Sequence, residues 1–238
     1  MNLYHFTSFE SAIKILTTET ILFSRIETLN DINESSGIMI LSESNTEIHK
    51  LLDKYTQISL TTDKGQHKGY DIPAMWGHYA SRGHGVCIVL DKDKIVKEVK
   101  RRGLYSREVE YSNNILPNDY EYDVNLHGTP RNFINMAKDS LFFRKTADWQ
   151  YEQEYRIVAV KNNVKPLEIK NSLKSVILYS RNHENFINSI ECRVLSRIVD
   201  KNIIYRYAMY FHKGNLYDIN GNSLTTINYD VSLTSGCE

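Results

Sequence analysis

Four short stretches of the sequence combine polar or aromatic side chains that could take part in a reaction. They are His5 with Thr7, the run Ser59 to Thr62, Trp76 with Tyr79, and Glu152 with Glu154. Carboxylates can stabilise positive charge that develops in a transition state. Aromatic faces can hold a flat cation by stacking and by cation–π attraction. The set therefore contains groups that could serve catalysis or hold a ligand.

Each of these side chains also has a purely structural explanation. His5 could be a satisfied histidine of a core or sheet edge, and Thr7 could cap a helix. Trp76 and Tyr79 could form one apolar helix face, and Ser59 could face outward from a strand. None of them identifies a function by itself.

Composition predicts one globular domain. The chain has 238 residues, 41% hydrophobic and 24% charged, with 29 basic and 29 acidic side chains. A chain of this length can bury a large core without disulfides or a structural metal. A balanced charge neither favours nor excludes nucleic acid, because phosphate binding requires a local basic stripe. We expect residues 1–160 to form the core and residues 161–238 an extension packed on the same domain.

Cysteine usage and the first residues predict a cytoplasmic protein. The three cysteines Cys87, Cys192 and Cys237 are far apart and follow no metal-ligand spacing, so we expect reduced thiols, no disulfide and no zinc. The start MNLYHFTSFES lacks the pattern of a signal peptide, and no apolar stretch approaches the thickness of a bilayer. We expect no membrane association.

Hydrophobic spacing predicts the elements that position the candidate side chains. The expected strands are Leu3–Thr7, Ile21–Arg25, Gln57–Thr62, His84–Leu90, Glu154–Val160, Ser175–Tyr179 and Ile203–Phe211. The expected helices are Ser8–Thr18, a short helix opened by Pro73, a helix opened by Pro130 with Phe133, Met136, Ala137 and Leu141 inward, and Glu184–Val199. Thr7 and Glu10 form a capping-box pattern for the first helix. The polar residues Asn30, Asp31 and Glu34 indicate a loop.

The order of these segments resembles an ADP-ribosyltransferase. The shared features are a His-x-Thr strand, a helix, a second strand, a Ser/Thr-rich strand leading to an aromatic helix, and a late glutamate that opens an apolar strand. More closely, the chain resembles the bacterial and phage family DUF2971. The matching segments are LYHFTSFESAIKIL, the loop at Asn30 and Asp31, MWGHYASRGHGVCIVL and RKTADWQYEQEYRI. Ile32 stands where that family usually has proline after Asn-Asp.

The resemblance implies an α+β fold with an ADP-ribosyltransferase-like split β-sheet core, flanking helices and a C-terminal α/β extension. It implies an NAD⁺-dependent mono-ADP-ribosyltransferase, a toxin or phage-defence effector, with NAD⁺ as substrate and no metal. The expected catalytic residues are Glu154, His5 and Tyr79. The expected NAD⁺ contacts are His5, Phe6, Thr7, Arg25, Asn30, Asp31, Ser59, Trp76, Tyr79 and Arg156.

Each expected role has a chemical reason. Glu154 would hydrogen-bond a ribose hydroxyl and stabilise the oxocarbenium-like sugar. Tyr79, or Trp76, would stack on the cationic nicotinamide ring. His5 would hydrogen-bond the adenosine ribose or the nicotinamide amide. A guanidinium, that of Arg25 or Arg156, would bind the pyrophosphate, although either could instead be a surface ion-pair partner.

Glu152 could serve the acceptor. Strand alternation would point Glu152 and Glu154 to the same side, and in transferases with a Glu-x-Glu pair the first carboxylate orients or deprotonates the acceptor. The alternative is a solvated charge at the entrance of a strand.

Other functions stay open at this point. We expect a macromolecular acceptor, RNA rather than protein, because KDKIVKEVKRRGLYSR at residues 92–107 is densely basic; a neutralising antitoxin protein is a possible partner. The alternatives are an NAD⁺ hydrolase and a non-enzymatic module that binds nucleic acid or protein. A hydrolase using Cys87 with His84 or His78 fits poorly, because Cys87 lies in an apolar strand.

Overall fold

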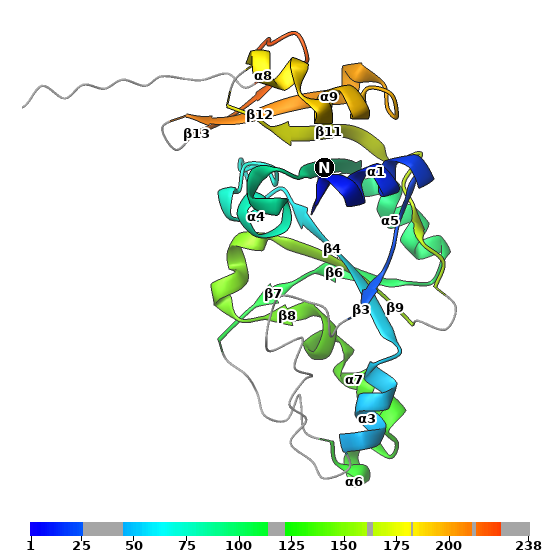
Figure 1. Ribbon diagram of the computed structural model, residues 1–238. Coiled ribbons are helices and arrows are strands. Elements are labelled where there is room, and N and C mark those ends of the chain that lie inside the picture. The colour runs from blue at the N-terminus through cyan, green and yellow to red at the C-terminus, as the bar shows by residue number, and fades with distance from the viewer. Residues whose placement is uncertain (26–44, 114–121, 161–163, 182, 211–212, 225–238) are drawn as a thin grey trace, which may run out of the picture.

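The computed structural model describes residues 1–25, 45–113, 122–160, 164–181, 183–210 and 213–224. Within these ranges the chain has a mixed α+β architecture, as the sequence predicted, and its sheet is mostly antiparallel (Figure 1). Asn30 and Asp31 lie outside the described residues. None of the described helices has both the length and the apolar character needed to cross a membrane.

One large sheet forms the centre of the molecule. Among the described residues it has nine strands in the order β13-β12-β11-β5-β1-β4-β9-β6, with β3 paired to β4. Its strands are β1 (Asn2–Thr7), β3 (Ser24–Arg25), β4 (Tyr55–Thr62), β5 (Val86–Asp91), β6 (Tyr105–Glu108), β9 (Glu154–Val160), β11 (Leu173–Tyr179), β12 (Ile204–Tyr210) and β13 (Lys213–Tyr217). Between the described strands of this sheet, the pairing of β11 with β12 is the one parallel pairing. The segment after residue 160 therefore continues the same sheet, because β11 pairs with β5.

Two small strand pairs and several helices complete the described chain. The strand pairs are β2 (Thr20–Ile21) with β10 (Leu167–Glu168), and β7 (Glu110–Tyr111) with β8 (Arg144–Lys145). The helices are α1 (Phe9–Thr18), α3 (Asn45–Leu52), α4 (Pro73–Tyr79), α5 (Lys92–Arg101), α6 (Val124–His127), α7 (Pro130–Phe143), α8 (His183–Asn188) and α9 (Ile190–Leu195). Short 3₁₀ turns are η2 (Ser81–Gly83), η4 (Ala147–Glu152) and η6 (Lys201–Ile203).

Helices cover both faces of the sheet. The helices α1, α5, α8 and α9 bury residues such as Leu16 and Ile95 against one face, in the same cluster as Leu3 and Leu60. On the opposite face, α4 packs through Trp76 against Tyr4 and its neighbours, and α3 and α7 form a further cluster with Val158. Adjacent residues such as Leu3 and Tyr4 thus belong to different faces, as the two-residue period of a strand requires.

Several predicted boundaries were wrong for local reasons. Helix α1 is capped by Ser8, whose hydroxyl accepts from the backbone N–H of Ser11 at 3.2 Å, and the expected capping box of Thr7 with Glu10 does not form. Glu10 instead pairs with Lys14. The predicted strand 21–25 is divided between β2, which pairs with β10, and β3, which pairs with β4.

Two predicted helices also differ from the structure. The single helix expected over residues 184–199 is two helices, because Ser189 interrupts it and caps α9. In α7, Phe133 and Leu141 face the core as predicted, whereas Met136 is 66% exposed. The buried stripe of α7 uses Ile134 and Phe142 instead.

Candidate functional site

A pocket opens in the sheet where β1 and β4 separate. Strand β1 pairs with β5 along all six of its residues, from Asn2 to Thr7. It pairs with β4 only at Leu3↔Thr62 and Tyr4↔Thr61. The residues beyond this point on both strands line a pocket of about 270 Å³. Loss of pairing between two neighbouring strands therefore creates the space for a ligand.

The pocket is lined by residues that are distant in sequence. They are Tyr4, His5, Phe6, Leu22, Ser24, Gln57, Ile58, Ser59, Leu60, Thr61, Met75, Tyr79, Lys145, Glu152 and Glu154. The structure thus brings together His5, Tyr79 and Glu154, the three side chains that the sequence analysis placed in one site. Phe6, Ser59 and Glu152, which were also predicted, line the same pocket.

His5 and Glu154 start from opposite faces of the sheet. The strand register aligns Tyr4, Thr61 and Glu154 across β1, β4 and β9, so Glu154 shares the face of Tyr4. His5, one residue further along β1, shares the face of Leu3. The two side chains can line one pocket because the sheet is open between β1 and β4.

The His5 imidazole is held as a neutral ring. Burial lowers the pKa of His5 to about 4, and a hydrogen bond with the backbone of Ser59 only partly opposes this shift. Within the described part of the chain, Nδ1 of His5 is buried and has no hydrogen-bond partner. A neutral imidazole with Nδ1 unpaired can offer this nitrogen to a hydrogen-bonding group of a ligand.

A second pocket residue carries an unpaired polar atom. Among the described residues, Oγ1 of Thr61 is buried without a hydrogen-bond partner. Buried polar atoms are normally paired, and an unpaired one requires an explanation such as a missing ligand or water. His5 and Thr61 therefore both fit a ligand that has hydrogen-bonding groups.

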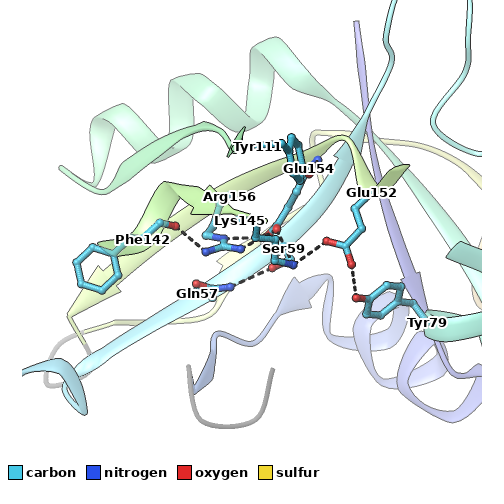
Figure 2. A network of polar contacts seen from close by, with 9 residues as sticks. All are labelled: Gln57, Ser59, Tyr79, Tyr111, Phe142, Lys145, Glu152, Glu154 and Arg156. Carbon is cyan, nitrogen blue, oxygen red and sulfur yellow. Dashed lines mark hydrogen bonds and ion pairs between the residues drawn. The ribbon is translucent and has the colours of Figure 1, made fainter. Parts of the chain in front are cut away.

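Two carboxylates and two cations form a buried network (Figure 2), and three of these side chains, Lys145, Glu152 and Glu154, line the pocket. Arg156 donates two hydrogen bonds to Glu154, from Nε to Oε1 at 2.8 Å and from Nη2 to Oε2 at 2.7 Å. Lys145 Nζ lies 2.7 Å from Oε2 of Glu152 and 3.2 Å from Oε2 of Glu154. The residues Lys145, Glu152, Glu154 and Arg156 are between 1% and 8% exposed. Because two negative charges meet two positive charges, the buried network is neutral.

Glu154 stays ionised because of this network. Burial opposes ionisation, but the charges of Arg156 and Lys145, together with hydrogen bonds from Arg156 and Ser59, outweigh it and lower the pKa of Glu154 to about 2. The Ser59 hydroxyl also accepts a bond from Gln57 Nε2 at 3.2 Å. Glu154 is thus an anion throughout the physiological pH range, and it is not suited to exchanging protons there.

An unusual backbone conformation lets Glu152 and Glu154 reach the same lysine. Glu152 ends the 3₁₀ turn η4, whereas Glu154 begins β9. Between them, Gln153 is left-handed, with φ 46° and ψ 48°, a conformation that non-glycine residues rarely adopt. The predicted strand alternation is therefore not what aligns the two carboxylates. The alternative that Glu152 is a solvated charge is wrong, because it is 3% exposed.

Tyr79 of α4 joins the buried network through a hydrogen bond to Glu152. It is the last residue of α4 and is partly buried. Its hydroxyl donates to Oε1 of Glu152 in a short hydrogen bond. Figure 2 shows the two side chains pointing toward one another, with Glu152 between Tyr79 and the group formed by Lys145, Glu154 and Arg156.

The structure places other predicted ligand contacts away from the pocket lining. Trp76 is 4% exposed and stacks on Tyr207, with ring centroids 5.4 Å apart and an interplanar angle of 8°. Arg156 is 1% exposed and is bound to Glu154 and to the Phe142 carbonyl, so it holds a carboxylate instead of facing a pyrophosphate. Arg25 lies exposed in β3, and Thr7 ends β1.

Lys145 is the main pocket residue that the sequence analysis missed. It lies in the segment RKTADWQYEQEYRI that carried the family resemblance. A lone lysine before a polar turn has no periodic pattern that would mark it as buried. Its proximity to both glutamates depends on the pairing of β8 with β7 and on the left-handed Gln153.

The structure bears on the alternative of a hydrolase that uses Cys87 as its nucleophile. Cys87 is completely buried in β5, and burial raises the pKa of its thiol well above the ordinary value, which opposes formation of the nucleophilic thiolate. Cys87 and Cys192 are both free thiols. Within the described ranges, no three or more His, Cys, Asp or Glu side chains are grouped so as to hold a metal ion.

Comparison with known proteins found one family model that matches part of the chain. Residues 75–157 match the model of a family described as "Protein of unknown function (DUF2971)". This match supports the DUF2971 family. The matching segment runs from α4 into β9 and includes Tyr79, Lys145, Glu152 and Glu154. No curated protein and no solved structure matches the chain.

Proposed function

We propose that this protein is an NAD⁺-dependent ADP-ribosyltransferase. The observation that carries the proposal is a pocket beside the partly paired strands β1 and β4, lined by two buried carboxylates and a tyrosine. A pocket of about 270 Å³ is at the small end of ligand sites. It would hold the nicotinamide–ribose end of NAD⁺ and leave the adenosine end outside the described lining.

In this reaction the glutamates, Tyr79 and His5 of the pocket would each have a role. The bond between ribose C1′ and the nicotinamide nitrogen breaks, and its electron pair neutralises the positive ring. One carboxylate of the pair Glu152 and Glu154 supplies negative charge while the sugar becomes oxocarbenium-like. C1′ then bonds to an oxygen or nitrogen atom of the acceptor, which releases a proton. Tyr79 offers an aromatic face to the cationic ring, and neutral His5 accepts a hydrogen bond from an amide or a hydroxyl.

RNA is the acceptor class that we propose. Helix α5 presents Lys94, Lys97 and Lys100 to solvent, and phosphates would be attracted to such side chains. Some charge in this region is already compensated, because Arg101 pairs with Glu98 and Lys92 pairs with Glu108. Lys94, Lys97 and Lys100 do not take part in these two ion pairs, so they are the lysines to substitute when RNA binding is tested.

The first prediction concerns NAD⁺ consumption. We expect the purified full chain to release nicotinamide from NAD⁺, and to transfer label from the adenylate phosphate of NAD⁺ into total cellular RNA. Nicotinamide is measured by chromatography, and labelled product is treated separately with nuclease and with protease. The double variant Glu152→Gln/Glu154→Gln should be inactive. Glu10→Gln, which changes an exposed carboxylate of α1, should match the wild type.

The outcomes separate the alternatives. Nicotinamide release without label transfer would identify an NAD⁺ hydrolase. Label that resists nuclease and disappears with protease would reject RNA as the acceptor. An intact NAD⁺ pool after incubation with RNA and with whole-cell extract would reject the enzyme and favour a binding module.

The second prediction concerns Tyr79. Tyr79→Ala removes the aromatic face and should weaken NAD⁺ binding about 2–10-fold, the range expected for one aromatic or cation–π contact. Tyr79→Phe keeps the ring and should bind NAD⁺ at least as well as the wild type. Titration calorimetry measures both variants. A larger loss for Tyr79→Phe than for Tyr79→Ala would show that the hydroxyl, and not the ring, holds the ligand.

A further inference from the structure

The two carboxylates of the network differ in how their oxygens are occupied. Both are 3% exposed and both line the pocket, so burial does not distinguish them. Glu154 receives two bonds from Arg156, a contact from Lys145 and a hydrogen bond from Ser59. Glu152 pairs with Lys145 through one oxygen and accepts the Tyr79 hydroxyl on the other.

A substrate hydroxyl would have to displace a different hydrogen-bond partner at each carboxylate. At Glu154 it would compete with a bidentate guanidinium that is 1% exposed and also donates to the Phe142 carbonyl at 2.6 Å. Displacing that guanidinium would leave a buried charge without its partner, which is strongly unfavourable. At Glu152 it would replace the neutral hydroxyl of Tyr79, which lies at the end of a short helix and is only partly buried.

We infer that Glu152 is the carboxylate that meets the substrate, and that Glu154 is a positioning residue. This inference rests on the proposed function and names the residue that serves it. A ribose hydroxyl takes the place of the Tyr79 hydroxyl on Oε1 of Glu152. Glu154, fixed by Arg156, holds Lys145, and Lys145 holds the other oxygen of Glu152. The order of importance is therefore the reverse of that expected from the resemblance, in which Glu154 contacts NAD⁺ and Glu152 serves the acceptor.

Two variants test this assignment on the full chain. Glu152→Gln keeps the volume and removes the charge, so nicotinamide release should fall about 10²–10³-fold, as for loss of one preorganised electrostatic group. The double variant Glu154→Leu/Arg156→Met removes one negative and one positive charge and leaves the Lys145–Glu152 pair in place. It should turn over NAD⁺ at least about tenfold faster than Glu152→Gln.

Folding and function are separated by the controls. Circular dichroism and a melting curve establish that each variant is folded at the assay temperature. The single variant Glu154→Gln, which removes the carboxylate charge and retains Arg156, is the comparison for the double variant. Faster NAD⁺ turnover by Glu154→Leu/Arg156→Met than by Glu154→Gln supports a positioning role for Glu154. A folded double variant as inactive as Glu152→Gln, or a Glu152→Gln protein with wild-type turnover, would overturn the assignment and leave the proposed function intact. A wild type that does not consume NAD⁺ would overturn both.

Discussion

Arg156→Met is expected to lower the free energy of unfolding by about 3–5 kcal/mol, the loss typical of breaking a buried ion pair by removing one partner. Arg156 is 1% exposed and makes two hydrogen bonds to Glu154 and one to the Phe142 carbonyl. The variant leaves Glu154 buried with less compensation and the carbonyl without its donor. Urea denaturation followed by circular dichroism measures the effect.

A matched double variant distinguishes loss of charge balance from loss of volume. Glu154→Leu/Arg156→Met removes both charges together, and replacing a whole buried pair by apolar side chains is often neutral or stabilising. We expect it to recover most of the stability lost in Arg156→Met. If Arg156→Met were within about 1 kcal/mol of the wild type, as for an exposed pair, the network would not be the buried unit described here.

Trp76→Ala is expected to lower the free energy of unfolding by a similar amount, about 3–5 kcal/mol, as for other buried aromatic side chains. Trp76 stacks on Tyr207, meets the edge of Phe6 with ring centroids 5.2 Å apart, and donates its Nε1–H to the Tyr70 carbonyl at 2.8 Å. Its removal would leave a cavity between α4 and the sheet, because these neighbours are anchored to other elements.

Trp76→Phe is the control for this prediction. It keeps an aromatic ring and loses the bond to Tyr70, so we expect a smaller loss, about 1–3 kcal/mol. Melting temperature and urea titration report both variants. A stable Trp76→Ala protein with weakened NAD⁺ binding would show that the indole serves the ligand, as the resemblance suggested, and that the packing on Tyr207 contributes little.

Patterns of apolar residues and prolines in the sequence were sufficient to locate several of the main strands and helices. The strand predicted over residues 57–62 lies within β4, and the apolar runs EYRIVAV and HGVCIVL located β9 and β5, because a buried strand needs apolar side chains whatever its partner. Proline at the first helical position located α4 and α7. Short segments were located less well, because strands as short as β2 and β3 owe their existence to pairing with distant residues and carry little signal of their own.

The sequence by itself determined the α+β class and the residue types that could serve a reaction, among them His5, Tyr79 and Glu154. Only the tertiary structure decided how they meet, through the early separation of β1 from β4 and the left-handed Gln153 that turns Glu152 toward Lys145. It also moved Trp76 into the core and Arg156 into an ion pair. The physical reason is that periodicity reports how much of a side chain is buried, whereas the partner of a buried charge is set by contacts between residues far apart in the chain.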